Sequence, residues 1–173
     1  MPITLQLDME LLDNGSIRLN DLIRHWHQEL GMSAGLVDST ELVCLHLDRF
    51  VLSPVGQLSK MHVPIGFLWS VDVPTLTDGI NCTWHGYQVV AAFAHSGDAS
   101  SGHYQALLRV GNEALPHQTP ALWLHCDDNR APRPCWHMPP EFASEVTCFW
   151  LCRCEQLELH NMRLPCPDML NTA

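Results

Sequence analysis

The sequence is poor in basic residues and contains no long apolar run. Nine Lys and Arg stand against nineteen Asp and Glu among 173 residues, which gives a formal net charge of −10 at pH 7. A protein that binds the phosphate backbone of a nucleic acid needs a basic face, so no nucleic-acid partner is expected. No stretch reaches the ~18–20 apolar residues that cross a membrane, so no membrane partner is expected either.

The first residues also lack the basic start and the apolar stretch of a secretory signal peptide. Eight cysteines in a chain without such a signal predict reduced thiols, and therefore an intracellular protein of the cytoplasm or the nucleus. Hydrophobic residues make up 46% and charged residues 16%, a balance that supports a packed core. There is no internal repeat. We therefore expect one domain over residues 1–160, followed by a tail over 161–173.

Apolar periodicity predicts many strands and one helix. Strands are expected at residues 3–9, 41–51, 61–69, 84–94, 103–110, 121–126 and 146–159. Between Leu19 and Leu30 the apolar residues fall on one helical face, with Asn20 as the expected cap and Gly31 as the end. Irregular segments are expected at residues 32–40, 70–83 and 132–140. Because strands dominate, the predicted class is α+β with mainly antiparallel pairing.

One histidine and one carboxylate are expected to meet at the end of this sheet. His103 begins a predicted strand directly after Gly102. The strand 103–110 runs outward by ~23 Å, and the strand 121–126 returns over ~20 Å if it is antiparallel, which brings Asp127 back toward His103. A carboxylate there fixes the imidazole tautomer and leaves the second ring nitrogen to take a proton. The pair is either the base of a nucleophilic site or an ordinary surface contact.

Four segments, in order along the chain, resemble one known family. Residues 95–104, HSGDASSGHY, resemble the histidine box of the ubiquitin-specific proteases, which are papain-like cysteine deubiquitinases. Residues 123–128, WLHCDD, resemble that family's Trp-x-x-Phe-Asp-Asp box, with Cys126 at the aromatic position. Residues 45–50, LHLDRF, and 147–152, TCFWLC, are similar to two of its strands.

The resemblance covers about residues 3–155 and implies a papain-like deubiquitinase fold, of which the palm and part of the fingers are present. It implies His103 as the general base, Asp127 as the residue that orients it, and Asp128 as a support of the site. The residues implied beside the channel for the Gly-Gly tail of ubiquitin are Gly102, Tyr104 and His95. The implied partner is ubiquitin or a ubiquitinated protein, and no cofactor is implied.

The family's nucleophile box, similar to Gly-Asn-Thr-Cys-Tyr, has no counterpart in this sequence. The chain therefore resembles the C-terminal half of such a domain, with the helical thumb missing and the cysteine supplied by a missing N-terminal half. The eight cysteines fall on predicted strands or loops, whereas a reactive thiolate needs a helix N-terminus or a cationic neighbour.

The function expected from the resemblance is that of a deubiquitinase-type thiol hydrolase acting on the isopeptide bond at the ubiquitin C-terminus, inactive when alone. The alternatives are a non-catalytic ubiquitin-binding or scaffold module, and an incomplete gene product.

Zinc is a further alternative, because two groups of cysteine and histidine residues lie close together in the sequence. They are Cys148, Cys152, Cys154 and His160, and His125, Cys126, Cys135 and His137. Neither group has the two closely spaced pairs that mark a zinc motif. Free thiols are common in protein interiors, so no metal is expected.

Overall fold

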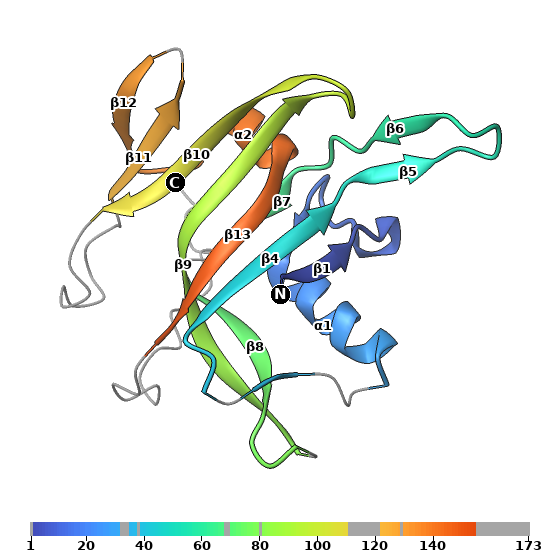
Figure 1. The fold of residues 1–173 in the computed structure, drawn as a ribbon, viewed down its shortest axis with the longest axis vertical. Helices are drawn as coiled ribbons and strands as arrows, with labels where there is room; N and C mark the ends of the chain where they lie inside the picture. Colours follow the sequence, from blue (N-terminus) through green and yellow to red (C-terminus); the bar gives the residue numbers. More distant parts are fainter. Residues whose placement is uncertain are drawn as a thin grey trace, which may run out of the picture.

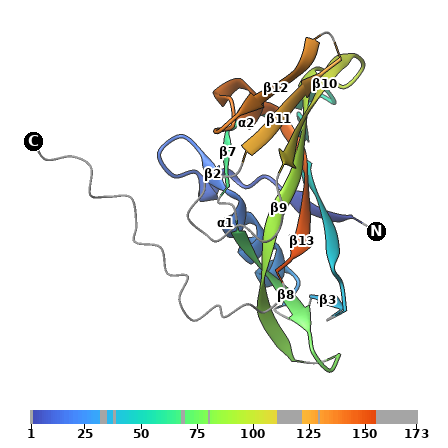
Figure 2. The same ribbon diagram turned by 90° about the vertical axis from the view of Figure 1, so that its left-hand side faces the viewer.

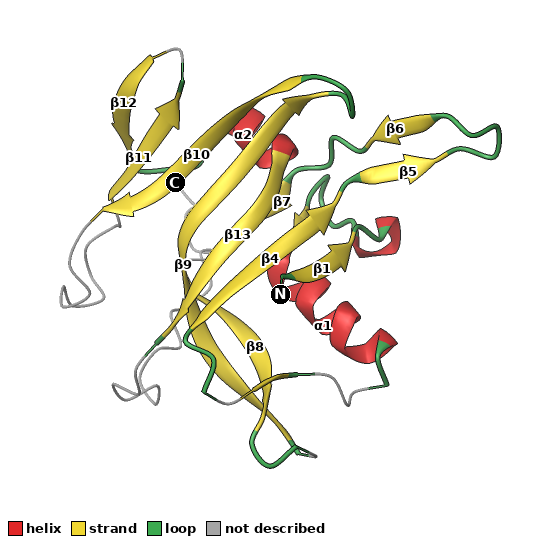
Figure 3. Cartoon of the chain, in the orientation of Figure 1, coloured by secondary structure: helices red, strands yellow, loops and turns green. Residues whose placement is uncertain are grey.

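The computed structural model describes residues 2–31, 35–37, 39–67, 70–79, 81–110, 122–128 and 130–154, in which strands dominate (Figure 3). The strands are β1 (Ile3–Gln6), β2 (Ile17–Arg18), β3 (Leu36–Val37), β4 (Leu42–Asp48), β5 (Phe50–Leu52), β6 (Leu58–Lys60), β7 (Ile65–Gly66), β8 (Ser70–Leu76), β9 (Cys82–Gly97), β10 (Gly102–Val110), β11 (Leu122–Asp127), β12 (Arg130–Cys135) and β13 (Val146–Arg153). The helical elements are η1 (Met9–Leu11, a 3₁₀ turn), α1 (Leu19–Glu29) and α2 (Pro140–Glu145). The predicted α+β class is confirmed.

The main sheet has the strand order β1-β4-β13-β9-β10-β11-β12, and β8 pairs with both β9 and β3 (Figure 1). Its pairs are antiparallel except for β1 with β4 and β3 with β8. The apolar run predicted as a central strand is β9, which lies between β13 and β10 in the sheet. Since β10 and β11 follow it as antiparallel neighbours, the two sequence boxes that carry the resemblance lie on adjacent strands.

Both helices and the short β2–β7 pair lie on one face of this sheet (Figure 2). Under the helices, alternate residues of the strands form one buried apolar cluster with the inner face of α1. Its members include Leu19, Leu22 and Ile23 of α1, Leu45 and Leu47 of β4, Phe149 and Leu151 of β13, and Leu107 and Trp123 of β10 and β11. None of the helices in the described ranges is long and apolar enough to span a membrane.

The helix boundaries correct one detail of the sequence prediction. α1 follows Arg18, whose side chain makes no capping hydrogen bond, so the predicted cap at Asn20 is wrong. Asn20 lies inside the first helical turn. The predicted end is confirmed, because Gly31 has a φ of 72°, a left-handed conformation that only glycine adopts without strain.

Several segments predicted as irregular are regular. The range 32–40 contains β3, and 70–83 contains β8 and the start of β9. The proline-rich range 132–140 contains most of β12 and the start of α2. Edge strands and the first turn of a helix tolerate proline because no partner there needs its N–H.

Three predicted strands are shorter than expected. The strand at 3–9 ends at Gln6, and of the strand at 61–69 the described residues 61–67 contain only β7. The strand at 41–51 is divided into β4 and β5 at Arg49, whose side chain is fully buried. Residues 155–159 of the predicted last strand, and the predicted domain end and tail at 160–173, lie outside the described residues.

Candidate active site

His103 and Asp127 meet at the end of β10 and β11, as the sequence predicts. The antiparallel register pairs Gln105 with Asp127, and His103 lies two residues earlier on the same face of β10. His103 Nε2 is 2.8 Å from Asp127 Oδ1, and the two side chains are 33% and 16% exposed. The imidazole is therefore open to solvent on one side, while the carboxylate that holds it is largely covered.

A second group holds Asp127 in place. Gln105 Nε2 donates to Asp127 Oδ2 at 3.5 Å, and the Gln105 carbonyl is 3.3 Å from His125 Nε2. His125 in turn packs edge-on against Phe142 of α2, with ring centroids 6.0 Å apart. Gln105 was not predicted from the sequence, although its position two residues after His103 places it on the same face of the strand. Both oxygens of Asp127 thus face donors, and Nδ1 of His103 has no hydrogen-bond partner among the described residues.

The hairpin between β9 and β10 brings together the other residues implied at the site. Tyr104 pairs with His95 across the strands, and their rings lie 4.6 Å apart at an angle of 40°. Gly102 lies under the His95 ring, where a Cβ would be 2.6 Å from His95 Cε1 and would collide with the carbonyl oxygen of Ser96. Only glycine fits there, so the hairpin presents bare backbone beside His103.

The turn of this hairpin is closed by Asp98. Its Oδ1 accepts hydrogen bonds from the Ser100 hydroxyl, the Ser100 N–H and the Ser101 N–H at 2.8–2.9 Å. The Ser100 side chain and then these N–H groups lower the pKa of Asp98 to about 2. The turn therefore keeps its charged, hydrogen-bonded carboxylate over the physiological pH range.

A buried ion pair holds the β9 end of this hairpin in place. Lys60, the only lysine of the sequence, donates to the backbone carbonyl of His95 and to the carboxylate of Glu145 at the end of α2. His62 Nδ1 is 2.5 Å from the other Glu145 oxygen. Burial raises the pKa of Glu145, but hydrogen bonds and charge from Lys60 and His62 outweigh it and lower the pKa. The strand end that carries His95 is thereby fixed to the end of β6 and, through Lys60, to α2.

Asp128 and the cysteines contribute nothing visible to this geometry. Asp128 is exposed in the turn after β11, and its role as a support stays a prediction. Cys126 alternates with Asp127 along β11 and so faces the other side of the sheet. The described residues contain no group of three or more His, Cys, Asp or Glu placed to hold a metal ion. His160, named in one zinc alternative, lies outside them.

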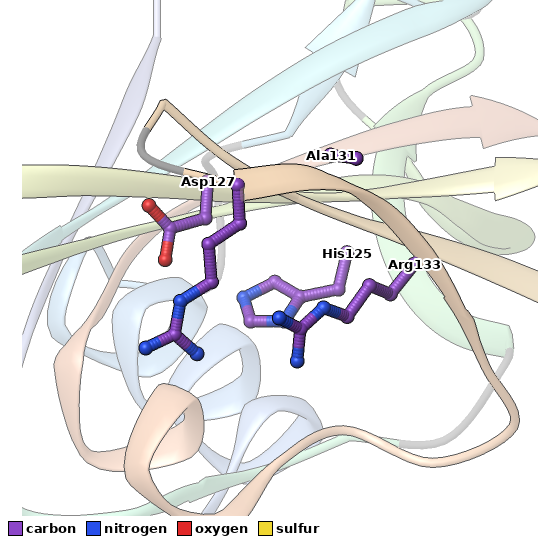
Figure 4. Close-up of a pocket in the computed structure, with 5 residues that line it drawn as sticks. His125, Asp127, Ala131 and Arg133 are labelled. Atoms are coloured by element: carbon purple, nitrogen blue, oxygen red, sulfur yellow. The ribbon is translucent and has the colours of Figure 1, made fainter.

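A small hollow adjoins the catalytic candidates on the β11–β12 side. It measures about 30 Å³ and is lined by His125, Asp127, Arg130, Ala131 and Arg133. Figure 4 shows the side chains of His125, Asp127 and Arg133 on one side of the β11–β12 hairpin. The two arginines were not singled out in the sequence.

The fold is an antiparallel sheet with helices on one face, and comparisons with known proteins identify it as the fold of a papain-like deubiquitinase. A family sequence model described as ubiquitin carboxyl-terminal hydrolase matches residues 35–140. The chain therefore belongs to the ubiquitin carboxyl-terminal hydrolase family. No curated protein is similar enough in sequence to count as a match.

Solved structures of the SAGA deubiquitinating (DUB) module have a similar fold. One, the yeast module with an Sgf73 mutant, gives a TM-score of 0.57 at 14% identity over 89% of this chain and 34% of that chain. The Ubp8/Sgf11/Sus1/Sgf73 module bound to ubiquitin aldehyde gives 0.57 at 13% identity over 89% and 36%. The module bound to monoubiquitin gives 0.54 at 13% identity over 89% and 35%. The present chain spans about a third of the length of these chains.

Proposed function

We propose that this chain supplies the general base and the ubiquitin-tail face of a deubiquitinase that hydrolyses the isopeptide bond at the ubiquitin C-terminus. The observation that carries the proposal is the 2.8 Å contact between His103 Nε2 and Asp127 Oδ1, beside the bare backbone of Gly102. Family membership and the two similar structures that hold ubiquitin aldehyde and monoubiquitin support ubiquitin as the partner.

In this proposal the thiol comes from a cysteine outside this chain. Nδ1 of His103 takes the thiol proton, and the thiolate attacks the carbonyl carbon of the isopeptide bond. The imidazolium then gives that proton to the departing lysine amine, which leaves a thioester that water hydrolyses. Asp127 holds the ring in the tautomer with Nε2 protonated and stabilises the imidazolium.

The described cysteines are poor substitutes for the missing nucleophile. Cys44, Cys82, Cys126, Cys135, Cys148, Cys152 and Cys154 lie on strands or directly after one, and none of these seven lies at the N-terminus of a described helix, where a thiolate would be stabilised. Burial raises the pKa of Cys135 and Cys154, and raises that of Cys148 to about 12. We therefore propose that the chain alone binds ubiquitin without cleaving it. This also keeps a non-catalytic ubiquitin-binding module as the second candidate.

Titration of the isotopically labelled chain with ubiquitin tests the proposal. We expect amide shift changes in residues 95–104 and 125–127, and smaller changes with ubiquitin that lacks its two C-terminal glycines. A titration to about 1 mM ubiquitin detects a binding free energy as weak as about −4 kcal/mol. Unchanged spectra at that concentration would contradict both candidate functions.

A ubiquitin probe with a thiol-reactive C-terminus distinguishes a chain that only binds ubiquitin from a chain that carries its own nucleophilic cysteine. We expect no covalent adduct. An adduct that disappears in His103→Ala would show that a cysteine of this chain is the nucleophile and would refute inactivity. The intracellular location predicted from the eight cysteines remains a prediction.

A further inference from the structure

A β-bulge places two arginines on the same face as the His–Asp pair. In the β11–β12 pairing Arg133 is opposite His125 and Arg130 is opposite Asp127, with a register shift between them. Arg130 and Arg133 are three residues apart, so on a regular strand they would point to opposite faces. The bulge turns both toward the face of His125 and Asp127, where both line the hollow of about 30 Å³.

The two guanidinium groups are available to a ligand. Both arginines are exposed, and neither guanidinium has a hydrogen-bond or ion-pair partner among the described residues. Among the described residues, the one carboxylate that lines the hollow is that of Asp127, and its two oxygens already face His103 and Gln105. The free donors in the hollow therefore exceed the free acceptors, in a chain whose net charge is −10.

The two arginine side chains and the room beside them suit a carboxylate. About 10–15 Å³ of such space holds one water oxygen, so the observed volume of about 30 Å³ has room for about two to three oxygen atoms. A carboxylate presents two oxygens in a plane, and arginine binds it with two parallel N–H donors.

The strand that borders the hollow also limits how a partner can bind. β12 is the last strand in the order, but Pro132 and Pro134 remove two of its N–H groups. Addition of a partner strand to this edge would therefore lose hydrogen bonds, and recognition through side chains is favoured.

We propose that the hollow binds a glutamate or aspartate side chain from an acidic segment of the protein to which ubiquitin is attached. The identity of this partner rests on the proposed function. In the proposed function the ubiquitin tail lies along the β9–β10 hairpin at Gly102. The β11–β12 side of His103 is then left for the protein whose lysine amine is released. Carboxylate binding itself depends only on Arg130 and Arg133.

The test is an NMR titration of the full labelled chain with two peptides, acetyl-Ala-Glu-Ala-amide and acetyl-Ala-Gln-Ala-amide. We expect the Glu peptide to shift signals of residues 125–133 with millimolar affinity and the Gln peptide to leave them unchanged. The double variant Arg130→Gln/Arg133→Gln should weaken Glu-peptide binding at least about tenfold, since two charge-assisted hydrogen bonds are lost. The matched control is Arg24→Gln, an exposed arginine of α1, which should bind as the parent does.

Equal shifts with both peptides, or unchanged affinity in the double variant, would overturn the inference. Tighter binding of inorganic phosphate than of the Glu peptide would overturn the choice of a carboxylate. Ubiquitin is titrated into the same samples and read at residues 95–104. Ubiquitin binding without Glu-peptide binding overturns this inference alone, and Glu-peptide binding without ubiquitin binding overturns the proposed function and the identity of the partner.

Discussion

Replacing Arg49 by methionine is expected to lower the free energy of unfolding by about 3–5 kcal/mol. Arg49 is fully buried at the junction of β4 and β5, and its guanidinium donates to four backbone carbonyls. The acceptors belong to Met61, Val63, Ala143 and Val146. Methionine fills a similar volume but leaves these carbonyls without their charged donor.

The expected loss is large because one side chain joins three separate segments. The carbonyls of Met61 and Val63 lie 2.9 Å from the guanidinium and belong to the segment before β7. Ala143 lies in α2, and Val146 begins β13. Burial lowers the pKa of Arg49 to about 10, against the opposing charge of Glu145, so the group stays charged at neutral pH. Its removal should loosen α2 and the segment that carries Lys60 together.

Urea unfolding followed by tryptophan fluorescence measures this effect. Arg24→Met, at an exposed position of α1, is the matched control and should stay within about 0.5 kcal/mol of the parent. The thermal midpoint of Arg49→Met should fall by at least about 6 °C. Should that variant fail to fold, Arg49→Lys, which keeps the charge but reaches fewer carbonyls, should show an intermediate loss. Stability of Arg49→Met equal to that of Arg24→Met would refute this role.

Replacing Gly102 by alanine is expected to weaken ubiquitin binding at least about tenfold and to cost about 1–3 kcal/mol of stability. The added methyl group would collide with the His95 ring and with the backbone oxygen of Ser96. The ring can move only by breaking its contact with Tyr104, and the backbone oxygen can move only with the strand. Relief therefore requires a shift of the strand that carries His103.

Gly66→Ala is the matched control, because a Cβ there would approach no atom more closely than 4.0 Å. It should bind ubiquitin as the parent does, since Gly66 lies in β7 and outside the proposed site. Binding measured by calorimetry, with unfolding measured in parallel, separates loss of the site from loss of the fold. Equal ubiquitin affinity of the Gly102→Ala and Gly66→Ala variants would show that the hairpin backbone is not a contact surface.

The contact between His103 and Asp127 could be predicted because it follows from the lengths of two strands that pair antiparallel. A strand that begins at His103 and a return strand that ends beside Asp127 must bring the two together if they pair. The packing around them could not be predicted in this way. Gln105 and the Lys60–Glu145 pair depend on which faces meet across the sheet, and sequence spacing does not contain that information.

Proline lies in two of the segments whose strands were not predicted. The range 70–83 was predicted to be irregular, yet β8 contains buried Val71, Val73 and Thr75 at a period of two, with Pro74 between the last two. In the structure Pro74 lies opposite Trp84 of β9, and the described pairing of β8 with β3 involves only Thr75 and Leu76. β12 was missed because Pro132 and Pro134 break a central strand but are tolerated at an edge. The bulge in the β11–β12 pairing, which places Arg130 and Arg133 in the hollow, could not be predicted from the sequence.

The most direct test of the account is the protonation of the His103 ring, read from long-range ¹H–¹⁵N correlation spectra under conditions where the ring is neutral. The account predicts a proton on Nε2, donated to Asp127, and none on Nδ1, which is the nitrogen assigned as the base. Asp127→Ala should remove this preference. A proton on Nδ1 in the parent chain, or the same spectrum in Asp127→Ala, would contradict the assignment of His103 and Asp127 as base and orienting group.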